Sequence, residues 1–343
     1  MNFIILGAGA IGCYVGARLA LGGQHVTFVG RPRLVEALAM NGLTVTDLDG
    51  FSGHLAGAAL RLATSLQEVA FTDEPAVILL CVKGGATLAA AQEIEQVCKR
   101  GTTIVSLQNG VDNVARIQTG APQMQVLAGM VPYNVVMNEL TGTESSRVHR
   151  ASAGSLSIAR SPTAERFAPI FSAAGLPTEL IDDMRAVQWG KLLLNLNNPV
   201  NALSELPLQA QLHDRSLRRV VADLQSEALA VMAHAGITPA QVTPVAPRAL
   251  PHLLRLPNWL FTRVAARMLR MDISARSSMA DDLSRGRVTE IDDLCGAVVR
   301  LAKAHGLAAP LNDAMCQLIP AHTQGHAVGG AVLAKMLMAA RPL

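Results

Sequence analysis

Short apolar runs, most of them stopped by glycine or proline, alternate with helical stretches in the first half of the chain. Short apolar runs bounded by turn residues are typical of buried strands, whereas apolar positions repeating about once per helical turn indicate helices. The alternation predicts an α/β domain with a parallel sheet. The strands are expected at residues 2–6, 25–29, 76–82, 102–107, 125–136, 155–159 and 177–182.

Beyond about residue 183 the pattern changes to long helical stretches. One covers 215–235 and is expected to stop at Gly236, because glycine commonly ends helices. Another helix is expected over 289–306, whereas the prolines of 239–257 favour a loop or short turns. We therefore expect two domains, an α/β domain over 1–182 and an all-helical domain over 183–343.

A glycine-rich turn follows the first predicted strand. The segment Gly7-Ala8-Gly9-Ala10-Ile11-Gly12 has the spacing GxGxxG and stands between a strand and a helix. In this setting the first glycine permits the turn, the second lets backbone approach a pyrophosphate, and the third lets helix and strand pack closely. The N–H groups of the helix N-terminus attract phosphate. The turn therefore predicts dinucleotide binding rather than a purely structural loop.

The end of the second predicted strand indicates which dinucleotide binds. An NAD site usually has Asp or Glu there to hold the ribose 2′-hydroxyl. Here the strand is followed by Gly30, Arg31, Pro32 and Arg33. A guanidinium suits a 2′-phosphate, so we expect NADPH rather than NADH. Arg31 is the better candidate because it comes directly off the strand; the alternative is a solvated surface arginine.

Polar residues also follow two later strands. Lys83 comes after the run at 76–82, and Asn109 comes after the run at 102–107. Ligands of open parallel sheets bind beyond the carboxyl ends of the strands, so both residues are candidate ligand contacts. Ordinary loop polarity is the alternative, because Asn-Gly is a common turn pair.

Residues 188–203, QWGKLLLNLNNPVNAL, place a lysine and several asparagines in an apolar segment. On a helix, Lys191, Asn195 and Asn198 form one narrow polar stripe. Asparagine donates and accepts hydrogen bonds without adding charge, so the stripe is either a solvent face or the lining of a cleft. Pro199 removes the helical hydrogen bond to the carbonyl of Asn195, which predicts a kink.

Composition narrows the function. The 29 basic and 26 acidic residues nearly balance, which gives no electrostatic case for nucleic acid binding. The five cysteines lack a CxxC pair, and the nine histidines show no ligand cluster, so a reduced protein without a metal site is expected. The segment 258–271 favours a core helix or a homodimer contact over membrane contact. With no targeting segment, the expected location is cytoplasmic.

Taken in order, these motifs resemble those of the ketopantoate reductase (2-dehydropantoate 2-reductase) family. GAGAIG is followed by Arg31, CVK, LQNG, WGKLLLN and SSMADDLSRGRVTEID, over nearly the whole chain. The resemblance implies a Rossmann-type domain, an all-α C-terminal domain like that of 6-phosphogluconate dehydrogenase, and a site in the cleft between them. It also implies NADPH-dependent reduction of 2-dehydropantoate to (R)-pantoate in pantothenate biosynthesis.

The resemblance also assigns roles to matching positions. Lys191 corresponds to the catalytic lysine that donates the proton, and Glu290 to the family's active-site glutamate. Burial would lower the pKa of Lys191 and nearby Glu290 would raise it. Without the family, Glu290 would be a first-turn acid and Ser278 a helix N-cap. The resemblance places Gly7, Ala8, Gly9, Ala10, Ile11, Gly12, Arg31, Lys83 and Asn109 at the cofactor, and Asn195, Asn198 and Ser278 at the substrate.

One departure leaves the substrate open. The family commonly has asparagine where Pro199 stands, and Asn198 one position earlier is the expected substitute. A reductase of the same chemistry acting on another 2-oxo acid is therefore an alternative. A non-catalytic NADPH-binding regulator is another, although the presence of both Lys191 and Glu290 argues against it.

Overall fold

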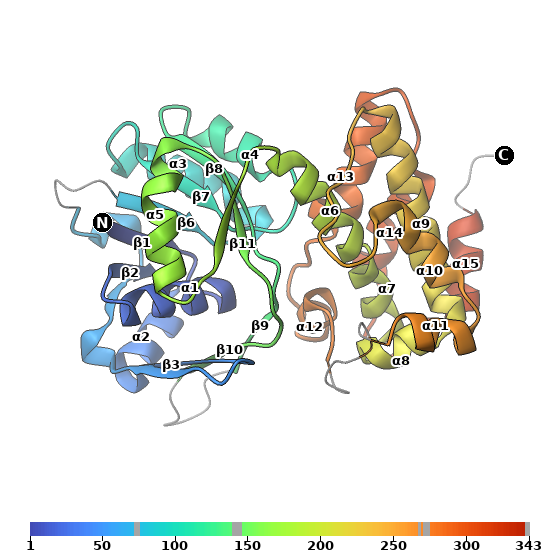
Figure 1. Cartoon of the computed structure of the whole chain (residues 1–343), viewed down its shortest axis with the longest axis horizontal. Coiled ribbons are helices and arrows are strands. Elements are labelled where there is room, and N and C mark those ends of the chain that lie inside the picture. The colour runs from blue at the N-terminus through green and yellow to red at the C-terminus, as the bar shows by residue number, and fades with distance from the viewer. Residues whose placement is uncertain (72–75, 139–145, 267–268, 270–274, 340–343) are drawn as a thin grey trace. The chain divides into compact units, whose positions relative to one another are not determined.

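The computed structural model of the 343-residue chain describes residues 1–71, 76–138, 146–266, 269 and 275–339. The chain forms two units, Met1–Met184 and Arg185–Leu343 (Figure 1). Each unit has its own buried apolar residues. The first unit is built on β-sheet, whereas every regular element in the described part of the second is helical.

The first unit contains an eight-stranded sheet in the order β12-β11-β8-β7-β6-β1-β2-β5. From β8 to β5 all neighbouring strands are parallel, while β11 runs antiparallel to β8 and parallel to β12. The strands are β1 Asn2–Leu6, β2 His25–Val29, β5 Arg61–Ala63, β6 Ala76–Leu80, β7 Thr103–Ser106, β8 Gln125–Met130, β11 Leu156–Ala159 and β12 Thr178–Ile181.

Helices cover both faces of this sheet, which explains why its central strands are apolar throughout. Successive strand residues point to opposite faces. Phe3 and Ile5 of β1 pack with residues of α1 (Ala10–Leu21) and α5 (Pro162–Ala173). Ile4 and Leu6 pack on the other side with α3 (Thr87–Val97) and α4 (Asn113–Gly120). A strand buried on both faces has no polar positions to alternate with apolar ones.

A second, four-stranded sheet in the order β4-β3-β10-β9 was not predicted. It contains β3 (Leu43–Asp47), β4 (Ser52–Leu55), β9 (Val135–Met137) and β10 (Ser146–Arg150). The single strand expected over 125–136 is wrong, because β8 ends at Met130 and β9 pairs with β10 in this other sheet. Pro132 stands between the two strands and has no N–H to contribute to a ladder.

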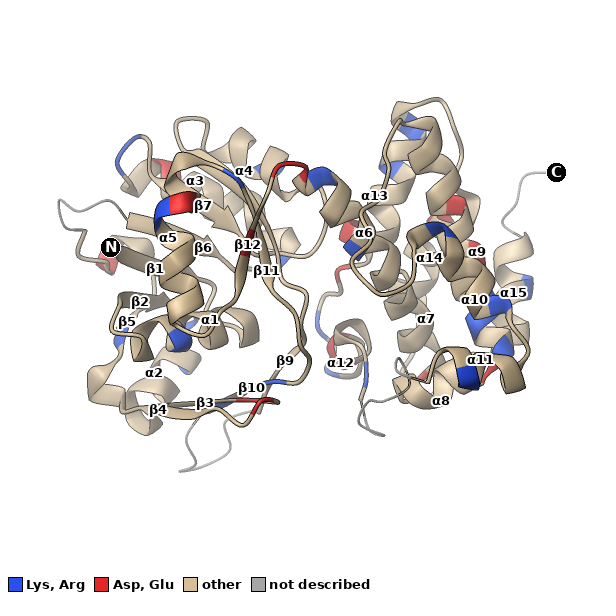
Figure 2. Ribbon diagram, viewed as in Figure 1, with Lys and Arg blue, Asp and Glu red and all other residues tan. Residues whose placement is uncertain are grey.

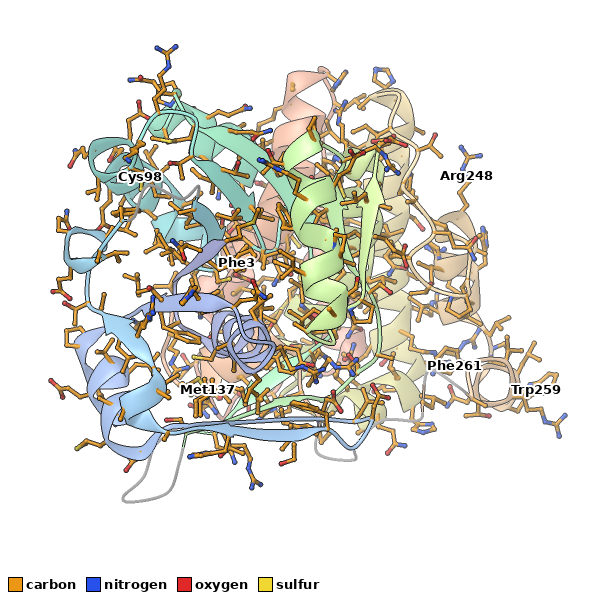
Figure 3. The ribbon with its side chains drawn as sticks, turned by 60° about the vertical axis from the view of Figure 1, so that its left-hand side comes forward. Phe3, Cys98, Met137, Arg248, Trp259 and Phe261 are labelled. Carbon is orange, nitrogen blue, oxygen red and sulfur yellow. The ribbon has the colours of Figure 1, made fainter. Side chains whose placement is uncertain are left out.

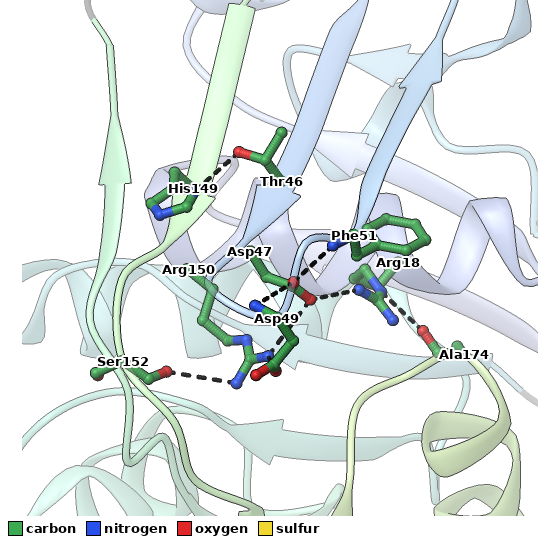
Figure 4. A network of polar contacts seen from close by, with 9 residues as sticks. All are labelled: Arg18, Thr46, Asp47, Asp49, Phe51, His149, Arg150, Ser152 and Ala174. Atoms are coloured by element: carbon green, nitrogen blue, oxygen red, sulfur yellow. Dashed lines mark hydrogen bonds and ion pairs between the residues drawn. The ribbon is translucent and has the colours of Figure 1, made fainter.

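A buried ion network joins the small sheet to α1 (Figure 4). Arg18 of α1 donates to Asp47 at 3.0 Å and to the carbonyl of Ala174 at 2.9 Å. Arg150 of β10 donates to the same Asp47 oxygen at 3.3 Å and also contacts Asp49. Although burial opposes its charge, hydrogen bonds from Phe51 N and Arg150 hold the pKa of Asp47 below its usual value. The network fixes the helix whose N-terminus follows the glycine turn.

In the second unit, α9 (Arg215–His234) contacts several other helices. Its N-terminus is capped by Asp214, whose carboxylate accepts from Ser216 N at 2.7 Å. The predicted stop is confirmed, since Gly236 has φ +68° just after the helix. The helices of this unit are α6 Met184–Asn195, α7 Asn197–Ser204, α8 Leu208–His213, α9, α10 Leu250–Arg255, α11 Asn258–Val264, α12 Ser278–Ser284, α13 Ile291–Ala304, α14 Pro310–Ala321 and α15 Gly330–Ala339.

Three segments in this unit differ from those expected. The helix expected over 258–271 ends at Val264, as α11. The segment 239–257 holds a short helix, α10, besides loop. The helix expected over 289–306 begins at Ile291. In α11, Phe261 is buried under the guanidinium of Arg218, whereas Trp259 points outward and is 66% exposed (Figure 3). Arg267 and Arg270 of the predicted 258–271 helix lie outside the described residues.

Basic and acidic residues are interspersed along the ribbon of each unit (Figure 2). Among the described residues, no helix is both long and apolar enough to cross a membrane. The same part of the chain contains no group of three or more His, Cys, Asp or Glu that could hold a metal ion.

Candidate active site

The turns after β1, β6 and β7 lie side by side at the carboxyl ends of these neighbouring parallel strands. Cys81 N, just after β6, donates to the carbonyl of Leu6 at 2.8 Å. Leu107 N, just after β7, donates to the carbonyl of Leu80 at 3.0 Å. The chain leaves β1 toward β2 on one side and returns to β6 on the other. This reversal beside β1 is where open α/β sheets bind ligands.

The first and third glycines of the turn are required by backbone geometry. Gly7 has φ +103°, and a Cβ built there would lie 2.6 Å from Val82 N. A Cβ on Gly12 would lie 2.4 Å from the carbonyl oxygen of Gly7 and 2.7 Å from the side chain of Ile5. No larger residue fits either place without moving backbone, which matches the packing roles expected of these glycines.

The second glycine differs, because the space beside it is open. Gly9 is exposed, and a Cβ built on it would meet no protein atom within 4 Å. It is the N-cap of α1, has no side-chain cap, and is followed by no acidic residue in the first turn. Ala10 and Ile11 contribute the first backbone N–H groups of this helix. Open space at the positive end of a helix fits a pyrophosphate.

Arg31 stands at the adjoining strand end. Gly7 N and Ala8 N both donate to the carbonyl of Val29, at 3.0 and 3.1 Å, which holds the end of β2 beside the glycine turn. Arg31 is exposed and is the N-cap of α2 (Pro32–Asn41). Within the described parts of the chain, no carboxylate forms an ion pair with its guanidinium. The residues present therefore fit a phosphorylated dinucleotide.

Lys83 and Asn109 follow the two neighbouring strands, as expected. Lys83 is exposed at the start of the short 3-10 turn η3 (Gly84–Ala86). Asn109 is partly buried, and its carbonyl accepts from Asn113 Nδ2 at 2.6 Å. Sequence reasoning missed Gln108, which donates across to the carbonyl of Val82 at 2.8 Å. The only signal for it was its place beside Asn109, because the sequence does not indicate which way its side chain points.

Lys191 lies in α6 of the second unit. Leu192, Leu193 and Leu196 are at most 2% exposed and form the packed side of the segment, while Lys191 is half-buried on another side. Burial lowers the pKa of Lys191, because desolvation disfavours the ammonium. The sequence alone did not decide whether the pKa of Lys191 is raised or lowered.

The kink predicted from Pro199 is confirmed. One helix, α6, ends at Asn195, and α7 begins at Asn197, with Leu196 between them. Asn195 and Asn198, two members of the predicted polar stripe, are half-buried. The stripe is thus divided between two helices instead of following one.

Two other asparagines of this segment have structural partners. Asn197 accepts from Gln211 Nε2 at 2.7 Å. Asn201 is completely buried, donates to the carbonyl of Leu206 at 2.8 Å and accepts from Ser277 N at 2.9 Å. These contacts explain part of the unusual asparagine content, because Asn197 and Asn201 hydrogen-bond α7 to α8 and to the N-cap of α12.

The N-termini of α12 and α13 carry the remaining candidates. The alternative that Ser278 caps a helix is wrong, because Ser277 is the cap and its Oγ accepts from Ala280 N at 3.2 Å. Ser278 is exposed in the first turn, and the Oγ of Ser277 donates to the carbonyl of Asn198 at 3.4 Å. Glu290 is the N-cap residue of α13 rather than a first-turn acid, and its side chain makes no capping bond.

Two family models match the chain. The model described as "Ketopantoate reductase PanE/ApbA" matches residues 3–162, and the one for the C terminal part of these enzymes matches residues 183–323. The chain belongs to the ketopantoate reductase family. It is therefore an oxidoreductase, with the family's Rossmann-type domain followed by its helical C-terminal domain.

Individual ketopantoate reductases are similar over nearly their whole length. The 2-dehydropantoate 2-reductases of Pyrococcus horikoshii and Halobacterium salinarum are each 28% identical, over 94% and 93% of this chain and 97% and 98% of their own. The crystal structure of a PanE/ApbA family ketopantoate reductase from Ralstonia eutropha has TM-score 0.77 and 28% identity, covering 98% of this chain and 99% of that one.

Another solved structure, of D-mandelate dehydrogenase with NADH and anilino(oxo)acetate, has TM-score 0.75 at 22% identity. It covers 94% of this chain and 98% of that one. At this identity the likeness shows a shared fold and nothing further.

Proposed function

We propose that this protein catalyses the NADPH-dependent reduction of 2-dehydropantoate to (R)-pantoate. The observation that carries the proposal is full-length similarity to relatives named for this reaction, in a chain whose glycine turn has room for a pyrophosphate beside Gly9. The segments that carry Lys191, Ser278 and Glu290 fall inside the C-terminal family match.

The first unit binds the cofactor in this proposal. The N–H groups that follow Gly9 hold the pyrophosphate, and Arg31 pairs with the 2′-phosphate. The remaining glycine-turn residues shape the backbone, while Lys83 and Asn109 contact the ribose and nicotinamide portion. When bound, NADPH supplies a hydride to the carbonyl carbon of the oxo acid.

Lys191 supplies the proton. Its ammonium donates a hydrogen bond to the ketone oxygen, stabilises the negative charge that develops there, and transfers a proton as the alkoxide forms. The lowered pKa of Lys191 makes it a stronger acid than an exposed lysine and brings its pKa nearer to working pH. The neutral amine then takes a proton from solvent, which restores the ammonium of Lys191; exchange of the oxidised cofactor and release of the hydroxy acid complete the turnover.

The substrate is oriented by uncharged groups. Asn195, Asn198 and Ser278 hydrogen-bond the hydroxyl and carboxylate of the oxo acid, and Glu290 lies close to cofactor and substrate. The two asparagines and Ser278 contribute positioning, whereas Glu290 is proposed as a catalytic residue together with Lys191. A homodimer and a cytoplasmic location complete the proposal. One observation supports the homodimer: Trp259 and Val264 of α11 are 66% and 60% exposed.

A steady-state panel tests the proposed substrate and cofactor together. NADPH oxidation is followed by absorbance with 2-dehydropantoate and with branched and aromatic 2-oxo acids, and each assay is repeated with NADH. The proposal expects the highest kcat/KM for 2-dehydropantoate with NADPH. A much higher kcat/KM for another oxo acid would show that 2-dehydropantoate is not the substrate. NADPH binding without turnover of any oxo acid would identify the protein as a non-catalytic regulator.

A further inference from the structure

Gln108 connects the strand ends that carry Lys83 and Asn109. It is only 8% exposed and stands just beyond β7, where Ser106 Oγ donates to its Oε1 at 3.0 Å. Its amide nitrogen donates to two acceptors across the sheet edge, the carbonyl of Val82 at 2.8 Å and Thr87 Oγ1 at 2.7 Å. Both amide hydrogens are therefore used, and both acceptors belong to the segment after β6.

The contacts continue back to the chain beside β7. Thr87 is the first residue of α3, and its hydroxyl donates to Asn113 Oδ1 at 3.3 Å. Asn113, the first residue of α4, donates from Nδ2 to the carbonyl of Asn109 at 2.6 Å. Ser106, Thr87, Gln108 and Asn113 thus form one hydrogen-bonded chain, the strand-end network.

Burial makes this network rigid. Thr87, Ser106 and Asn113 are 0%, 1% and 1% exposed. None of the network's side-chain polar atoms is among the described buried atoms that lack a partner. A buried polar network in which every member is satisfied holds one arrangement, because each lost bond leaves another group unpaired away from water.

The network holds main chain at the two candidate cofactor residues. At one end Gln108 donates to the carbonyl of Val82, the residue before Lys83. At the other end Asn113 donates to the carbonyl of Asn109 itself. We propose that the strand-end network is a positioning device that sets the spacing between Lys83 and Asn109 for the nicotinamide half of NADPH. This inference rests on the proposed function, and its key residues, Thr87 and Gln108, act through others without touching the cofactor.

Thr87 offers a near-isosteric test. Thr87→Val removes the hydroxyl that both accepts from Gln108 and donates to Asn113, while Thr87→Ser keeps it. The matched control is Thr103→Val at the other end of β7, because Thr103 is 5% exposed and its hydroxyl donates to Gln125 Oε1 at 2.9 Å. Both valine variants lose one buried threonine hydroxyl, but only the hydroxyl of Thr87 belongs to the strand-end network beside Lys83 and Asn109.

The readouts are NADPH affinity by isothermal titration calorimetry, KM and kcat, and thermal unfolding. We expect Thr87→Val to weaken NADPH binding about tenfold and to raise its KM, with Thr87→Ser close to wild type. Thr103→Val is expected to lower the unfolding temperature comparably with unchanged NADPH affinity. Hydrogen exchange of the cofactor-free protein should quicken at 82–90 and 106–113 in Thr87→Val alone.

The outcomes separate the two proposals. If wild-type protein binds NADPH and Thr87→Val binds it equally well, the positioning role is overturned while the proposed function stands. Equal weakening in Thr103→Val also overturns it, because the effect is then general destabilisation. If the wild-type protein does not bind NADPH at all, the proposed function fails, and the positioning role fails with it.

Discussion

The candidate cofactor site in Met1–Met184, formed by the turns after β1, β2, β6 and β7, differs in construction from the segment around Lys191 in Arg185–Leu343. The first uses backbone: glycines with no room for Cβ, strand ends and the N-terminus of α1. The second uses side chains that project from α6 and α7 around a break at Leu196. Substitutions at Gly7 and Gly12 should therefore act on binding and folding together, whereas those at the second site can separate chemistry from stability.

The largest effect is expected at Lys191. Lys191→Met keeps the length and apolar stem of the side chain but removes the proton donor, so kcat should fall by about 10³-fold. NADPH affinity should stay within a few-fold of wild type, because the proposed cofactor contacts lie in the first unit. Steady-state kinetics and calorimetric titration measure the two quantities. A variant that loses NADPH binding in proportion to kcat would show that Lys191 is not a separable acid.

The glycine turn should respond differently at neighbouring positions. Gly7→Ala forces Cβ into backbone at φ +103° and should cost about 3 kcal/mol of the free energy of unfolding. Gly9→Ala adds Cβ to open space, so stability should be unchanged while NADPH binding weakens about tenfold or more. Urea unfolding and NADPH titration compare the two. Equal NADPH affinity in Gly9→Ala and wild type would rule out pyrophosphate contact at this turn.

The same contrast explains what could be predicted from sequence. The strands β1 and β2 were predicted with their exact bounds, because an apolar strand stopped by a turn residue is visible locally. The small sheet was missed because LTVTD and SRVHR lack the continuous apolar run that identified the other strands, and because they pair across about a hundred residues of chain. In the helical unit, the sequence could not distinguish the half-buried Asn195 from Asn201, which is buried and hydrogen-bonded within the protein. Both are asparagines in one segment, and the orientation of each depends on residues that are distant in sequence.

These two asparagines provide the next comparison. Asn201→Ala leaves the carbonyl of Leu206 and the N–H of Ser277 without their partner and should cost about 2 kcal/mol of unfolding free energy. Asn195→Ala should leave stability nearly unchanged and raise the KM of the oxo acid. Chemical denaturation and steady-state kinetics measure both variants. Reversed results would exchange the structural and substrate-binding assignments.

The smallest effect is a pH dependence of stability. Because burial lowers the pKa of Lys191 in the folded protein, the unfolded chain holds this proton to higher pH. The penalty of burying the ammonium is present at neutral pH and disappears as pH rises through the lowered pKa toward the usual lysine value. Wild type should therefore gain stability relative to Lys191→Met between pH 7 and 10, measured by urea unfolding. A difference that is constant over this interval would contradict the lowered pKa.

The rate of a single turnover as a function of pH tests the central claim most directly. Wild-type enzyme is saturated with NADPH and mixed rapidly with 2-dehydropantoate, and absorbance follows hydride transfer. If Lys191 is the acid, the rate falls as pH rises through its lowered pKa, and Lys191→Met shows a slow rate without that alkaline limb. An alkaline limb with the same midpoint in Lys191→Met would show that another group donates the proton.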